Sequence, residues 1–178
     1  YKNRSLLTVS NHTSTIDDPF IWSVLFSSRE LLDLAWNGRM RWVMGASELM
    51  FTNSLSKWYF NKGRVLECIR GEGAYQEGVQ ECIHVLNNGG WVHLFPEGKT
   101  YPDSYRTYDK LKWGVGRIIE ETRPLVVPIR HWGMEHVRPL YSKKIGLFKR
   151  VDITCGGIVD TAKIDVEDEK MKEDGIPE

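Results

Sequence analysis

A histidine and an aspartate five positions apart carry the first chemical signal in the chain. His12 and Asp17 belong to the segment Asn-His-Thr-Ser-Thr-Ile-Asp-Asp-Pro at residues 11–19. Side chains share a helical face only at separations of three or four, so a bent loop must bring these two together. Asp17 would then accept a hydrogen bond from one imidazole nitrogen and leave the other free to take a proton, as a general base requires. The alternative is a helix cap beside a polar loop residue, because aspartate is a preferred N-cap.

The neighbouring segments predict how this pair is held. A short apolar run at 6–9 precedes it, and a segment with helical spacing begins at Pro19. Proline is favoured in the first turn of a helix. We therefore predict a strand over 6–9 and a helix over about 19–27, with His12 in the connecting loop and Asp17 at or near the helix N-cap.

A second motif lies far downstream, where the apolar run 91–95 leads directly into Pro96-Glu97-Gly98. In open α/β sheets ligands bind beyond the carboxyl ends of the strands, which is where Glu97 and Gly98 would lie. Gly98 would let a backbone approach a substrate closely, and Pro96 would stiffen the turn. Taken alone, the motif is also compatible with an ordinary turn.

Together, His12 with Asp17 and the sequence Phe-Pro-Glu-Gly at 95–98 resemble the first and third sequence blocks of the glycerolipid acyltransferase superfamily. The segment 63–70, Gly-Arg-Val-Leu-Glu-Cys-Ile-Arg, resembles the second block, which ends in an arginine that holds a lipid phosphate. The apolar segment 125–129 with its central proline resembles the fourth. The resemblance therefore implies a phosphate-binding role for Arg70.

Three further segments, 71–78, 91–99 and 111–117, are similar to a branch of this superfamily that remodels cardiolipin in mitochondria by phospholipid–lysophospholipid transacylation. The resemblance implies that His12 deprotonates a lysophospholipid hydroxyl and that Asp17 orients His12. It also implies that Glu97 and Gly98 shape the glycerol-phosphate side, that no coenzyme A or other cofactor is needed, and that the protein lies on a mitochondrial membrane. An acyl-CoA-dependent lysophosphatidate acyltransferase and a non-catalytic membrane-binding domain are the alternatives.

Composition and charge define the expected partners. The chain has 178 residues, is 41% hydrophobic and 27% charged, and carries no formal net charge. These values fit one globular domain, and neither the charge nor a basic-aromatic motif indicates a nucleic-acid partner. Residues 39–70 hold six Lys/Arg against two acids, a surplus of +4, together with many aromatic and Met side chains. This mixture predicts contact with anionic lipid at a membrane surface, although an ordinary amphipathic helix has similar residues.

Neither the histidines nor the cysteines suggest a metal site. His131 and His136 lack cysteine or carboxylate neighbours at metal-ligand spacing, and the three cysteines form no C-x-x-C pair. His93 lies within an apolar run and is expected to be a hydrogen-bonded interior residue. No apolar run reaches the ~18–20 residues that cross a bilayer. The chain begins at Tyr1 directly before the first strand, so we expect any targeting or anchoring segment outside the printed sequence.

The predicted strands and helices alternate along the chain, which is typical of an α/β fold with a mostly parallel central sheet and helices on both faces. The predicted strands are 6–9, 42–46, 65–69, 91–95, 125–130 and 151–155. The predicted helices are about 19–27, 48–60, 73–87 and 111–122. We expect an acyltransferase domain over 1–160 and an acidic, partly disordered tail over 161–178, since 160–178 hold eight acids against three lysines.

Overall fold

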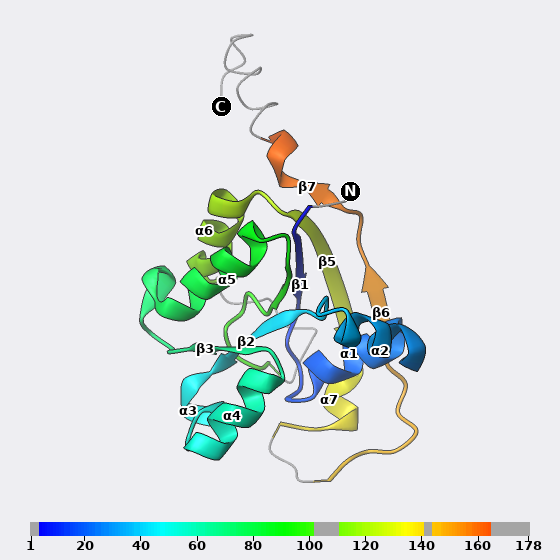
Figure 1. The fold of residues 1–178 in the computed structure, drawn as a ribbon. Helices are drawn as coiled ribbons and strands as arrows, with labels where there is room; N and C mark the ends of the chain where they lie inside the picture. The colour runs from blue at the N-terminus through cyan, green and yellow to red at the C-terminus, as the bar shows by residue number, and fades with distance from the viewer. Residues whose placement is uncertain (1–3, 102–110, 141–143, 165–178) are drawn as a thin grey trace.

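A computed structural model describes residues 4–101, 111–140 and 144–164, and it consists of a twisted sheet between two layers of helices (Figure 1). The strands run in the order β3-β2-β4-β1-β5-β6, and the short β7 also pairs with β5. The first five strands in this order are mutually parallel, whereas β6 and β7 are antiparallel to β5. The strands are β1 (Leu6–Ser10), β2 (Trp42–Ala46), β3 (Val65–Cys68), β4 (Trp91–Leu94), β5 (Leu125–Trp132), β6 (Asp152–Cys155) and β7 (Val159–Asp160).

Helices connect the parallel strands, as crossover connections require. The helices are α1 (Asp17–Leu25), α2 (Ser28–Trp36), α3 (Ser47–Met50), α4 (Ser54–Lys62), the 3-10 turn η1 (Gly73–Tyr75), α5 (Glu77–Asn87), α6 (Trp113–Thr122) and α7 (Met134–Val137). The prediction of a mostly parallel sheet covered on both faces is confirmed.

Two apolar cores lie on opposite faces of the sheet because successive strand residues point to opposite sides. On one face Leu7 and Val92 pack against α5 and α6, in a cluster that includes Ile83 and Ile118. On the other face Ile129 packs against Trp22 of α1. Figure 1 shows α5 and α6 on one side of the sheet and α1 and α2 on the other. The sheet is thus a rigid platform for the loops at its ends.

The carboxyl ends of the five parallel strands share one edge of the sheet, which we call the carboxyl edge. The loops after β1, β2, β4 and β5 all leave from this edge, and in Figure 1 it lies at the end of the molecule opposite the N-terminus. Both chemical motifs predicted from the sequence therefore begin at the same edge.

Several helices differ from the prediction, and the short α7 was not predicted. The helix predicted over 48–60 is broken into α3 and α4, because Asn53 forms a capping box with Ser56 and starts a new helix. The helix predicted over 73–87 begins with the 3-10 turn η1. Helix α2, started by a Ser27–Glu30 capping box, was not predicted, and none of its residues is buried. The prediction that Asp17 lies at or near the helix N-cap is confirmed, since Asp17 is the first residue of α1 and follows the N-cap residue Ile16.

Two further points concern the ends of the domain and the bilayer. Most of the predicted acidic tail, residues 165–178, lies outside the described residues, so the division at 160 stays a prediction. In the described part of the chain, every helix is too short or too polar to cross a membrane.

Candidate active site

His12 and Asp17 meet at the carboxyl end of β1. The Nδ1 of His12 lies 2.9 Å from Oδ2 of Asp17, and the His12 side chain is 21% exposed while that of Asp17 is fully buried. A carboxylate accepts hydrogen bonds, so this contact places the proton on Nδ1 and leaves the lone pair on Nε2. Within the described parts of the chain Nε2 forms no hydrogen bond. The loop between β1 and α1 thus produces the geometry that the spacing predicted.

Asp17 is held in place by hydrogen bonds from the loop that it closes. Its Oδ2 also accepts hydrogen bonds from the backbone N–H groups of Thr13 (2.6 Å) and Ser14 (2.9 Å). The N-terminus of α1 adds the positive end of the helix dipole, which favours a carboxylate in the first turn. Charge-assisted bonds of this kind are about twice as strong as neutral ones. The acid therefore occupies one fixed position behind His12.

The Phe-Pro-Glu-Gly segment packs directly against His12. The Phe95 ring stacks on the imidazole with centroids 4.1 Å apart and planes 20° from parallel. Oε1 of Glu97 accepts a hydrogen bond from the His12 backbone N–H (3.2 Å), and the His12 carbonyl accepts one from the N–H of Tyr101 (2.7 Å). The loop after β4 therefore fixes both the ring and the backbone of the candidate base.

Gly98 turns the chain immediately after Glu97. Its φ of +69° lies in the left-handed region, and a Cβ there would come within 3.1 Å of the Lys112 side chain. The Lys112 backbone N–H also donates to the Pro96 carbonyl (2.9 Å). Lys112, at the start of α6, was not predicted as a neighbour of the site. Its position depends on a crossover that sequence spacing alone does not determine.

A clamp between β1 and β5 supports the other side of His12. The Asn11 side-chain amide donates to the His131 carbonyl (2.7 Å) and accepts from the His131 backbone N–H (2.9 Å). Nε2 of His131 lies 2.8 Å from the Asn11 carbonyl and 3.6 Å from Oδ2 of Asp17. His131 is fully buried. From the sequence, His131 was weighed only as a metal ligand, and its contact with Asn11 was not predicted, because the pairing of β1 with β5 joins residues that are 120 positions apart.

Burial shapes the electrostatics of the cluster. Loss of water raises the pKa of the Glu97 carboxyl, and the hydrogen bond from His12 opposes that rise only in part. Beside Phe95, whose ring it contacts edge-on, His93 is fully buried, and burial lowers the pKa of this imidazole to about 4, so it is neutral at pH 7. Its ring nitrogens lie 2.9 Å from the Thr8 hydroxyl and 3.3 Å from that of Ser10. The expectation of a hydrogen-bonded interior histidine is confirmed.

Polar atoms without a protein partner are concentrated at this site. Among the described residues, the four buried side-chain atoms of this kind are Thr13 Oγ1, Asp17 Oδ1, Glu97 Oε2 and His131 Nδ1. All four belong to the two loops and the clamp around His12. Buried polar groups are normally paired, so such a concentration is typical of a functional site rather than a core.

Arg70 lies at the same edge but outside this cluster. Its guanidinium forms an ion pair with Glu48 (3.1 Å), and both side chains are about half exposed, at 47% and 49%. Arg70 follows β3, which is three strand positions from β1, or about 14 Å at the usual strand spacing. The structure therefore brings His12, Asp17, Glu97 and Gly98 together and leaves Arg70 separate from them.

Comparison with known proteins identifies the family of this arrangement. The family model described as Acyltransferase matches residues 1–132. The chain belongs to this acyltransferase family, as the His12-x4-Asp17 and Phe-Pro-Glu-Gly blocks had indicated.

Tafazzins are among its relatives. The tafazzin of Dictyostelium discoideum is 41% identical over 143 residues, which is 77% of this chain and 48% of the relative. The tafazzin of Drosophila melanogaster is 40% identical over 141 residues, covering 78% and 35%. An N-acylphosphatidylethanolamine synthase of Arabidopsis thaliana is 39% identical over 136 residues, covering 75% and 46%. The chain thus spans about half or less of the length of these curated relatives.

The fold is similar to that of a solved enzyme. The crystal structure of the 1-acyl-sn-glycerophosphate acyltransferase PlsC from Thermotoga maritima superposes with a TM-score of 0.66 at 23% sequence identity. The likeness covers 97% of this chain and 63% of that one. At this identity the comparison concerns the fold alone.

Proposed function

We propose that this chain is the catalytic domain of a transacylase that moves acyl chains between phospholipids and lysophospholipids without coenzyme A, in cardiolipin remodelling. Membership of the acyltransferase family and the tafazzin relatives support this class of reaction. The observation that carries the proposal is the 2.9 Å contact between His12 and Asp17, together with an Nε2 of His12 that bonds to none of the described residues.

The reaction needs one proton-transfer group that works in both directions. Nε2 of His12 takes the proton from a lysophospholipid hydroxyl, and the oxygen attacks the ester carbonyl of the donor phospholipid. The new C–O bond gives a tetrahedral intermediate, and Asp17 stabilises the imidazolium that forms beside it. When the intermediate collapses, the donor's glycerol oxygen leaves and takes the proton from His12. The acyl chain has then changed carrier, the proton balance is closed, and no cofactor is consumed.

The remaining residues would hold the substrates. Glu97 and Gly98 shape the glycerol-phosphate side beside His12, and Arg70 binds a phosphate with its planar fork. Because Arg70 lies outside the His12 cluster, we assign it to a phosphate distant from the reacting ester. A doubly phosphorylated lipid such as cardiolipin has such a second phosphate.

The relatives and the surface also support a proposal for the location. We propose that the protein works at a mitochondrial membrane surface with a preference for anionic lipid. The surplus of cations over acids in 39–70 supports this preference.

Label exchange provides the direct test. The chain would be mixed with acyl-labelled phospholipid and unlabelled lysophospholipid, without coenzyme A, and transfer of label would be measured. We expect His12→Ala to reduce transfer by at least about 10³-fold, because it removes the general base. The matched control is His84→Ala, on the exposed face of α5, which should transfer label as the wild-type chain does. Equal transfer by a folded His12→Ala protein would refute the mechanism.

The Arabidopsis relative suggests a second acceptor. The name of that enzyme indicates that the amine of phosphatidylethanolamine is acylated. His12 would promote this reaction by taking a proton from the amine. Including phosphatidylethanolamine in the exchange assay would distinguish the two, because an amide product resists mild alkali and an ester does not. A further arm with acyl-CoA as the only donor would test the acyl-CoA-dependent alternative.

A further inference from the structure

Helix α4 presents an apolar stripe to solvent instead of to the core. Leu55, Trp58 and Tyr59 are spaced i, i+3 and i+4, so they share one helical face. Their exposed fractions are 74%, 59% and 65%. On a surface helix such a stripe ordinarily faces the core. In α4 the aromatic contact toward the protein comes from Phe60, which packs beside Phe51. Tyr59 also contacts the neighbouring Phe60 edge-on, with ring centroids 5.3 Å apart, but no described residue covers the stripe.

The loop before β6 exposes a second apolar pair. Leu147 is 73% exposed, and Phe148 is completely exposed with a φ of +56°. A bulky residue rarely adopts this left-handed conformation, which costs free energy. The Gly146 N–H donates to the Val137 carbonyl (2.7 Å) and ties the loop to α7. A contact with a partner outside the chain would explain why the loop holds Phe148 in a strained conformation that points to solvent.

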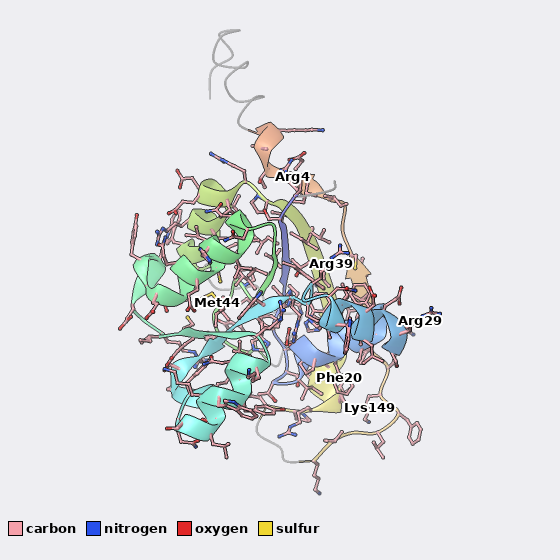
Figure 2. All side chains as sticks on the ribbon, in the orientation of Figure 1. Arg4, Phe20, Arg29, Arg39, Met44 and Lys149 are labelled. Carbon is pink, nitrogen blue, oxygen red and sulfur yellow. The ribbon has the colours of Figure 1, made fainter. Side chains whose placement is uncertain are left out.

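Both features belong to the carboxyl edge that holds His12. Helices α3 and α4 follow directly from the carboxyl end of β2. The loop leads into Asp152, which pairs with Trp132 at the carboxyl end of β5. Figure 1 shows α4 and this loop at the same end of the molecule, and Lys149 of the loop is labelled there in Figure 2. We call Leu55, Trp58, Tyr59, Leu147 and Phe148 the apolar rim.

Cations accompany the apolar rim, and the two segments that carry it contain no acid. Residues 54–62 hold Lys57 and Lys62, and residues 144–150 hold Lys144, Lys149 and Arg150. Lys57 and Arg150 pair with Glu67 and Asp152. Lys62 and Lys149 form no ion pair with any described residue. A second copy of the chain docked through this face would bring like charges together, whereas an anionic bilayer complements them.

We propose that the apolar rim is a membrane-docking surface that seats the carboxyl edge on an anionic bilayer, with α4 and the 144–150 loop as its two contacts. The proposal rests on the proposed function for its purpose, since the substrates are bilayer lipids. Exposed aromatic and apolar residues flanked by Lys and Arg have the composition of interfacial membrane contacts. Docking by two separated elements holds the edge parallel to the surface, so that His12 faces the lipid layer.

Vesicle binding tests this surface independently of catalysis. Binding of the full chain would be measured by flotation with phosphatidylcholine vesicles, prepared with about 0%, 20% or 40% of the anionic lipid phosphatidylglycerol. We expect the double variant Leu147→Ser/Phe148→Ser to weaken binding by about tenfold or more, because two inserted side chains are lost. Trp58→Ser should act in the same direction, and Lys149→Glu should weaken binding about fivefold or more, and only to anionic vesicles.

The control is Ile158→Ser, which changes an exposed apolar residue (54%) beside β7, at the opposite edge of the sheet. It should bind vesicles as the wild-type chain does, and so should His12→Ala. Equal binding by the rim variants and the control would overturn the proposal, as would wild-type protein that does not float with any vesicle. A dimer in buffer that the rim variants disperse would show that the occupant is a second copy. A wild-type chain that floats with anionic vesicles but transfers no acyl label would instead count against the proposed function alone.

Discussion

The carboxyl edge of the sheet has a rigid centre and an open outer end. At the centre, around β4, β1 and β5, Asp17 and His131 are fully buried and Glu97 is 6% exposed. At the outer end, after β3, Arg70 and Glu48 are about half exposed and contact chiefly each other. His12, the proposed proton-transfer group, is therefore positioned before any substrate arrives, since its neighbours already hold its ring and its backbone. Among the described residues, Arg70, the proposed phosphate contact, is positioned by its surface ion pair with Glu48, and such a pair contributes at most about 1 kcal/mol.

Among the variants at the carboxyl edge, the largest loss of activity is expected when the Asp17 carboxylate is replaced. Asp17→Asn keeps the shape of the side chain, but it no longer fixes the proton on Nδ1 of His12 or stabilises an imidazolium. We expect kcat for acyl exchange to fall about 10³-fold. The matched control is Asp18→Asn in the same helical turn, whose carboxylate binds Arg41 and Trp22 instead of His12. Equal losses in both variants would mean that Asp17 acts through the stability of α1.

A smaller effect is expected from the clamp behind His12. His131→Leu removes the contact of Nε2 with the Asn11 carbonyl, the peptide group from which His12 departs. Small displacements of a catalytic group can cost up to about 10²-fold, so we expect kcat to fall about 10- to 100-fold with little change in KM. His131→Gln can supply a side-chain N–H to the same carbonyl and should recover much of this loss. A rise in KM without a fall in kcat would show that His131 serves substrate binding instead.

Arg70 at the open end should give a third, weaker response. Arg70→Ala removes the proposed phosphate contact and should raise KM up to about tenfold while kcat changes little, because the reacting atoms are elsewhere. Glu48→Ala, which releases the guanidinium from its ion pair, should lower KM or leave it unchanged. Unchanged kinetics in both variants would place the phosphate contact on another residue.

The sequence predicts some features of the molecule and not others. Features set by residues close together in the sequence could be predicted, whereas contacts between distant strands could not. The sheet and the dyad could be predicted, because apolar runs identify buried strands and because His12 and Asp17 lie within one loop. The clamp could not, since Asn11 and His131 meet only through the pairing of β1 with β5. The break between α3 and α4 depends on the Asn53 cap, a local signal within a continuous helical pattern. Contacts between residues that are distant in the sequence therefore depend on the order of the strands, which local patterns do not reveal.

Glu97 offers the smallest and most specific test, because it joins the two motifs at the rigid centre. Burial raises the pKa of its carboxyl above the ordinary 4.5, so the folded state holds the proton more tightly than the unfolded state does. The stability that this provides is complete below pH 4.5 and is lost as the pH rises through the folded-state pKa. Glu97→Gln carries no charge and keeps an oxygen that can accept from the His12 N–H. We therefore expect the variant to be more stable than the wild-type chain at pH 7.

Denaturant unfolding of both proteins at several pH values between 4 and 7 would measure this difference. The advantage of Glu97→Gln should shrink toward pH 4, because the wild-type carboxyl is then protonated and the two side chains differ little. Glu81→Gln, on the exposed face of α5, is the control and should show no such trend. If the free energies of unfolding of the two proteins differed by the same amount at every pH, Glu97 would not lie in a desolvated site. The centre of the carboxyl edge would then be more open to water than its burial indicates.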